Sequence, residues 1–147
     1  MDEKKRRELV RGYLRGTVGL SDARFIPLLT HDPFAHDRFY YACMHNVQGD
    51  MEAGGYHAFD ALTSWTVVMG FALADAQGSY APKTYMYVMH LKKDSPHIPS
   101  YINLVHTMQR EVIFAPFVYE VIGVDYRHGV KCAYISFHSI GKLIAPR

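Results

Sequence analysis

The residues best suited to chemistry are gathered in one short stretch, Gly54-Gly55-Tyr56-His57 with Asp60 three residues later. We expect a helix to begin here, where free backbone N–H groups and the positive end of the helix dipole can polarise a carbonyl group. Because a glycine lets a ligand oxygen come close to the backbone, the amides of Gly55 and Tyr56 are predicted to bind that oxygen. His57 and Asp60 share one face of the first turn, and this spacing predicts a catalytic pair that activates water.

Simpler interpretations of the same residues stay open. The two glycines could form only a tight turn, and Tyr56 could serve only in packing. Asp60 could complement the helix dipole while His57 hydrogen-bonds a loop carbonyl. Asn46, at the end of the strand predicted before this stretch, is a further candidate for orienting a substrate carbonyl.

Several other functional classes find little support in the sequence. There are 9 histidines, yet none forms a helical ligand pair, and His31 and His36 lie five apart in a predicted loop. We therefore expect no metal site and no cofactor. Ser64 and Ser136 lack the GxSxG elbow of serine hydrolases. A formal net charge of +2 does not predict a nucleic-acid partner.

The elements that must position these residues follow from the hydrophobic patterns. A length of 147 residues fits a single domain, 1–147. Residues 58–76 are apolar nearly all round, which predicts a long helix enclosed by other elements, with Val68 and Phe71 buried. The remaining elements are short N-terminal helices within 3–29 (3–14 and 22–29), a strand at 38–47, and meander strands within 85–140 (85–91, 101–113, 117–126 and 130–140), with turns at 94–100, 115–116 and 125–129.

The same stretch, 58–76, is the only one of membrane length, but it carries Asp60 and Asp75 near its ends and Gly70 inside. We expect it to be a buried helix without membrane insertion. The charged N-terminus does not resemble a signal peptide. Cys43 and Cys132 lie far apart in the sequence and are predicted to be reduced thiols. The charged N-terminus and the reduced thiols together favour a cytoplasmic protein.

The predicted order of helix, strand, long buried helix and four strands resembles the hot-dog superfamily, whose members are thioesterases and dehydratases of acyl-CoA and acyl-carrier-protein substrates. Residues 26–34, IPLLTHDPF, look like the "LLPHRYPF" opening of bacterial hydroxyacyl-ACP dehydratases. Residues 54–61, GGYHAFDA, occupy the place of their "GHFP" element and are similar to the "GHFNA" stretch of mycobacterial-type long-chain fatty-acyl-CoA thioesterases. The resemblance implies an α+β hot-dog fold, a five-stranded antiparallel sheet wrapped around one long central helix.

This resemblance implies a thioesterase that hydrolyses a fatty-acyl or polyketide-type thioester of CoA or acyl carrier protein. Dehydratases pair a loop histidine with a glutamate in the same helix, but no glutamate occurs in residues 53–110, and Glu111 and Glu120 fall on predicted strands. A dehydratase is therefore an alternative, as is a non-catalytic or NTF2-like protein that binds a lipid or polyketide. Hot-dog sheets pair edge to edge, which predicts a homodimer or larger assembly.

Overall fold

The computed structural model describes residues 2–30, 38–47, 51–92 and 100–141. Its elements are α1 (Glu3–Leu14), the 3-10 helix η1 (Ala23–Leu28), β1 (Arg38–Met44), β2 (Tyr56–Phe59), β3 (Thr63–Thr66), α2 (Met69–Gln77), β4 (Tyr85–Leu91), β5 (Tyr101–Leu104), β6 (Glu111–Phe114), β7 (Phe117–Arg127) and β8 (Val130–Ile140). Strands therefore dominate the chain, and the two α-helices are short.

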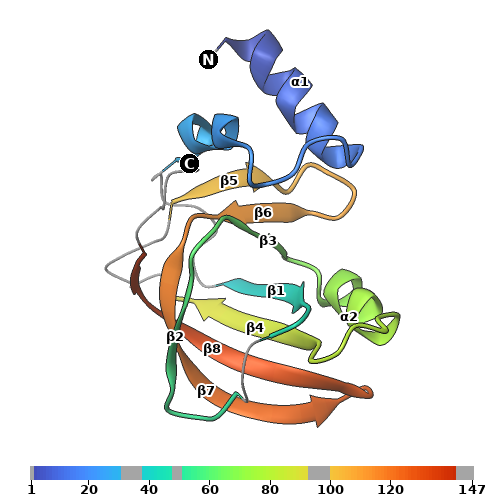
Figure 1. Cartoon of the computed structure of the whole chain (residues 1–147), viewed down its shortest axis with the longest axis vertical. Helices are drawn as coiled ribbons and strands as arrows, with labels where there is room; N and C mark the ends of the chain where they lie inside the picture. Colours follow the sequence, from blue (N-terminus) through green and yellow to red (C-terminus); the bar gives the residue numbers. More distant parts are fainter. Residues whose placement is uncertain (1, 31–37, 48–50, 93–99, 142–147) are drawn as a thin grey trace.

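The strands form one eight-stranded sheet in the order β2-β7-β8-β4-β1-β3-β6-β5. The pair β4–β8 is parallel, and the other six pairs are antiparallel. Figure 1 shows β5, β6 and β3 beneath α1 at one end of the molecule, with β7 and β8 at the other end and α2 at the side of β3 and β4. The sheet is thus mixed, and strands distant in sequence, such as β1 and β4, meet at its centre.

The long helix predicted over residues 58–76 is wrong. Its first half is a pair of strands, β2 and β3, and only Met69–Gln77 is helical. The aromatic and β-branched side chains of the segment TSWTVV favour extended backbone. Strand β3 is followed closely by helix α2, so the strand and helix periodicities merge into one apolar stretch. Val68 and Phe71, predicted to be buried, are each 37% exposed. Phe71 is exposed because α2 covers the sheet with one face only, and Val68 lies in the extended segment just before α2.

Most other elements lie where the sequence patterns place them. The helix at 3–14 and the strands at 85–91 and 130–140 are confirmed with the same bounds. The strand expected over 101–113 is instead two strands, β5 and β6, which pair with each other through a turn. Residues 31–34 of the dehydratase-like opening, His36, and most of the turn expected at 94–100 lie outside the described residues.

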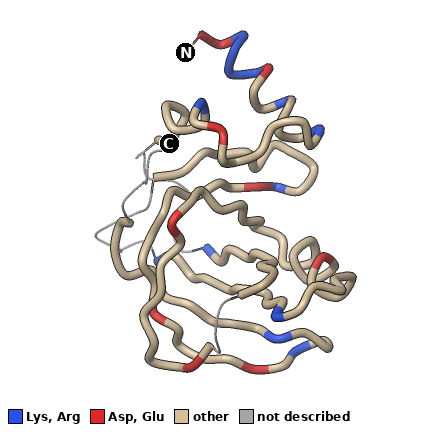
Figure 2. The backbone as a smooth tube through the Cα atoms, in the orientation of Figure 1, with Lys and Arg blue, Asp and Glu red and all other residues tan. Residues whose placement is uncertain are grey.

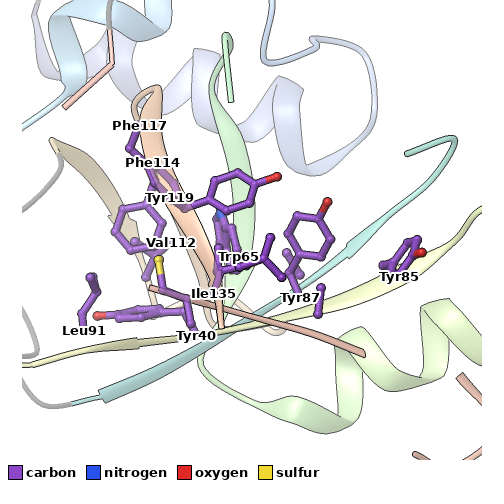
Figure 3. Close-up of a cluster of buried hydrophobic side chains, with 14 of the residues drawn as sticks. Tyr40, Trp65, Tyr85, Tyr87, Leu91, Val112, Phe114, Phe117, Tyr119 and Ile135 are labelled. Atoms are coloured by element: carbon purple, nitrogen blue, oxygen red, sulfur yellow. The ribbon is translucent and has the colours of Figure 1, made fainter. Parts of the chain in front are cut away.

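The main hydrophobic core is rich in aromatic side chains, which come from strands throughout the sheet (Figure 3). Trp65 of β3 contacts Phe59 of β2 at 6.0 Å and Phe117 of β7 at 6.2 Å between ring centroids. A second cluster joins α1 and η1 to β5 and β6 around Phe25, and a third packs α2 on β4 and β8 around Cys132. Each helix is therefore fixed to the sheet by its own apolar contacts.

The hot-dog prediction is wrong for this chain, because no helix within the described residues is surrounded by the sheet and the strand order is not a simple meander. The expected dimer rested on hot-dog edge pairing, so that argument does not apply to this fold. Across the part of the chain that the structure describes, no helix is both long and apolar enough to span a membrane.

Candidate active site

The candidate active site is built by β3 and β6, which pair antiparallel with Thr66 opposite Glu111. Side chains alternate between the two faces of a strand. Trp65 is therefore directed into the core, where it is 1% exposed, while Ser64 and Thr66 take the opposite face together with Glu111. The short segment Ser64-Trp65-Thr66 thus anchors the sheet with its ring and supplies two hydroxyl groups to the site.

Glu111 is the central group of this site. The residue is only 8% exposed. The Ser64 hydroxyl donates a hydrogen bond to Glu111 Oε2 at 2.8 Å, and the Tyr13 hydroxyl donates to the same oxygen at 2.8 Å. Within the described residues nothing donates to Oε1. A buried carboxylate needs hydrogen-bond donors, so the two hydroxyls fix one oxygen and leave the other for a ligand.

Tyr13 reaches this carboxylate from α1. Its ring packs edge-on against Phe25 of η1 at 5.7 Å between centroids. Burial, together with the neighbouring Glu111 carboxylate, raises the pKa of Tyr13 to about 12, although the hydrogen bond with Ser64 acts in the opposite direction. Tyr13 therefore keeps its proton at neutral pH and stays a hydrogen-bond donor.

The turn that precedes β6 is held tightly against β3. The Thr66 hydroxyl donates to the carbonyl of Gln109 at 2.7 Å, and the Thr107 hydroxyl donates to the carbonyl of Leu104 at 2.6 Å. Arg110 adopts a left-handed backbone with φ 49, a conformation uncommon outside glycine. This geometry fixes the backbone of Gln109 two residues before Glu111.

Two cavities meet at Glu111. The α2 cavity, about 150 Å³, is lined by Tyr41 and Cys43 of β1, by Phe71 and Asp75 of α2, and by the polar residues of β3 and β6. The α1 cavity, about 740 Å³, is lined by the end of α1 and by the turn from His106 to Gln109. Ser64, Gln109 and Glu111 line both. The carboxylate therefore stands where two separate molecules, or two parts of one molecule, can approach it.

A thiol lies on the next strand, β1, and an imidazole lies just beyond the end of that strand. The sulfur of Cys43 is 3.8 Å from His45 Nε2, and His45 Nδ1 is 3.1 Å from the hydroxyls of both Thr84 and Ser79. Burial, and to a smaller extent Asp75, raises the pKa of Cys43, so the thiol is protonated at neutral pH and is not a ready nucleophile. The described part of the chain contains no group of three or more metal-ligating side chains.

The residues predicted from sequence lie elsewhere. Tyr56 and His57 are on β2, opposite Glu120 and Tyr119 of β7. Gly55 precedes that strand and Asp60 follows it, so the expected helix start is absent and no first turn joins His57 to Asp60.

None of these residues lines the α1 or α2 cavity. The ring of His57 stacks on Tyr119 at 5.8 Å and lines a third cavity, the β2 cavity, of about 310 Å³. Asn46 has a left-handed backbone with φ 54 at the end of β1. Their part in binding or catalysis stays a prediction.

Sequence reasoning missed the Glu111 site because its parts are far apart in the chain. Ser64 and Tyr13 are 47 and 98 residues from Glu111. A local signal did exist: Glu111 is the first residue of β6 and all the others are apolar, and a glutamate at the start of a buried strand is unusual. The alternation of hydroxyl, aromatic and hydroxyl residues at 64–66 was a second signal.

Comparison with solved structures identifies the fold. The Vis toxin, an ADP-ribosyltransferase from Vibrio splendidus, superposes with a TM-score of 0.50 at 13% identity over 71% of this chain and 49% of that chain. Vis in complex with the M6 inhibitor gives a TM-score of 0.51 at 12% identity, over 71% and 50%, and Vis in complex with agmatine gives 0.50 at 12% identity over the same shares. No family model and no curated protein matches the chain by sequence.

The fold is therefore that of the ADP-ribosyltransferases, and the chain spans about half the length of the Vis structures that it matches. This finding overturns the predicted function. The neighbours are enzymes of ADP-ribose transfer, so hydrolysis or dehydration of an acyl thioester, and acyl-CoA or acyl carrier protein as partners, are wrong. The NTF2-like alternative is excluded by the same fold.

Proposed function

We propose that the chain is an ADP-ribosyltransferase that breaks the bond between nicotinamide and ribose in NAD and transfers ADP-ribose to an acceptor, with Glu111 as the catalytic residue. The observation that supports this proposal is the environment of the Glu111 carboxylate. It is buried, its Oε2 is held by Ser64 and Tyr13, and it borders two cavities.

The chemistry requires such a group. When nicotinamide leaves, the electron pair of the broken bond goes to the ring nitrogen and positive charge develops on the ribose carbon. A fixed carboxylate in a partly dry site stabilises this charge better than a solvated one. The nucleophilic atom of the acceptor then bonds to that carbon and loses a proton. Water in place of the acceptor yields free ADP-ribose.

In this proposal the α2 cavity receives the nicotinamide end of NAD. Tyr41 and Phe71 give it aromatic walls suited to a flat ring. The α1 cavity, on the other side of Glu111, receives the acceptor beside the ribose of NAD, and there the Gln109 amide can both donate and accept hydrogen bonds. Placing the nicotinamide and the acceptor on two sides of one carboxylate lets the acceptor approach as nicotinamide departs.

The diphosphate of NAD needs positive charge, and no Lys or Arg lines the α2 cavity within the described residues. Figure 2 shows Lys and Arg gathered along α1. Arg6, Arg7 and Arg11 line a groove of about 540 Å³ between α1 and β5, the arginine groove, which shares Leu14 and His106 with the α1 cavity. Guanidinium groups suit phosphate oxygens, so this groove is our candidate for the diphosphate.

The experiment is a measurement of nicotinamide released from NAD by the purified chain, with and without candidate acceptors. Agmatine, which Vis binds in one of the matched structures, and a set of proteins serve as acceptors, and NAD labelled in its adenosine part reports transfer. We expect nicotinamide release in every case, accompanied by labelled product when an acceptor is accepted. No nicotinamide release from NAD under any of these conditions would overturn the proposal.

A further inference from the structure

The C-terminal turn of α1 is fixed to the chain that follows it. The backbone N–H and the hydroxyl of Thr17 donate to the carbonyl of Gly12 at 2.9 and 3.0 Å. A Cβ atom on Gly12 would lie 2.8 Å from a methyl group of Val18, so a larger residue here would force the Val18 side chain to shift. The turn holds residue 13 in one place relative to the sheet.

Tyr13 stands on that turn with its ring supported and its hydroxyl in the active site. The ring contacts Phe25, which is fully buried, and α1 itself packs on β5 and β6 through Leu9. The hydroxyl donates to Glu111 Oε2, the oxygen that also accepts from Ser64. Two donors on one carboxylate oxygen fix both the rotation of the carboxylate and the direction of its second oxygen.

We infer that Tyr13 is a positioning residue, whose hydroxyl acts with that of Ser64 to hold Oε2 so that Oε1 faces the ribose of NAD. This inference rests on the proposed function and assigns to α1 a part in it. Ser64 alone would leave the carboxylate free to turn about a single hydrogen bond, whereas a second donor from another element of the fold removes that freedom. Positioning of this kind acts on the turnover step rather than on substrate binding.

The test is the Tyr13→Phe variant, which keeps the ring against Phe25 and removes only the hydroxyl. We expect kcat for nicotinamide release to fall about tenfold, the effect of losing one hydrogen bond to a charged group, while KM for NAD stays within about twofold. The melting temperature should fall by no more than about 5 °C. The matched control is Tyr126→Phe, which removes the hydroxyl of a 70% exposed tyrosine on β7 and should leave both constants unchanged.

Three results would overturn the inference. The first is an unchanged kcat in Tyr13→Phe while Glu111→Gln is inactive, which would leave the proposed function standing. The second is a raised KM with an unchanged kcat, because it would place Tyr13 in binding rather than positioning. The third is a wild-type protein that releases no nicotinamide, which removes the proposed function and the role of Tyr13 with it.

Discussion

Two polar regions of this molecule invite comparison, the Glu111 site on β3 and β6 and the β2 region that carries His57 and Asp60. In the first, hydroxyls from two other elements meet one buried carboxylate at 2.8 Å. In the second, Tyr56 is 59% exposed and Asp60 lies on the surface. Both regions contain residues whose side chains can act in catalysis, but only the Glu111 site holds a charged group in a fixed and desolvated position.

The difference teaches that convergence of side chains matters more than their spacing along the chain. A histidine and an aspartate three residues apart form a pair only if the backbone is helical, and β2 is a strand, so the two side chains do not share a helix face. The Glu111 site depends on pairing between β3 and β6 and on the packing of α1, all of which join distant parts of the sequence.

The largest effect is expected from Glu111→Gln, which removes the charge and keeps the size and hydrogen-bonding atoms. Without the carboxylate the developing positive charge on ribose is not stabilised, so kcat for nicotinamide release should fall by about 10³. Circular dichroism and the melting temperature check that the fold is intact. Glu120→Gln on β7 is the matched control and should keep wild-type activity, since Glu120 lines neither cavity at Glu111. Equal activity of Glu111→Gln and wild type would contradict a catalytic role for Glu111 and remove the functional difference between the Glu111 site and the β2 region.

Ser64→Ala should have the next largest effect. It removes one of the two donors to Oε2 and leaves Tyr13 in place, so kcat should fall about tenfold with little change in KM. Steady-state kinetics of nicotinamide release measure both constants. Ser139→Ala on β8, a surface hydroxyl near His138, serves as the control. A Ser64→Ala variant with unchanged kcat would show that the carboxylate does not need this hydrogen bond.

A smaller effect is expected from Arg11→Gln in the arginine groove. If a guanidinium group holds the diphosphate, KM for NAD should rise roughly threefold to fivefold at low salt, and the difference from wild type should shrink as salt screens the exposed charge. The control is Arg15→Gln, at the end of α1 but outside the groove. A KM that does not change at any salt concentration would remove the arginine groove from NAD binding.

The smallest effect belongs to the β2 region. His57→Ala and Asp60→Asn should each change kcat by less than about twofold, because neither side chain lines the cavities that meet at Glu111. Both are assayed beside Glu111→Gln with the same substrate. A loss of about a hundredfold in either variant, with the melting temperature unchanged, would return catalysis to the residues that the sequence pattern favoured.

Local sequence patterns predicted the parts of the fold that obey one periodicity. The helix at 3–14 has an apolar stripe, and β4 and β8 are long apolar or alternating runs. The helix predicted over residues 58–76 was wrong because strand, turn, strand and helix follow one another within a single apolar stretch. The site could not be predicted from spacing, because its hydrogen bonds depend on which strands become neighbours, and periodicity carries no information on strand order.

A structure of the Glu111→Gln variant with bound NAD tests the central claim most directly, because the variant should bind NAD without consuming it. Our account predicts the nicotinamide ring in the α2 cavity between Tyr41 and Phe71, with a ribose hydroxyl within hydrogen-bond distance of the side chain at position 111. NAD bound instead in the β2 cavity beside His57, or an NAD molecule with its ribose turned away from residue 111, would contradict it.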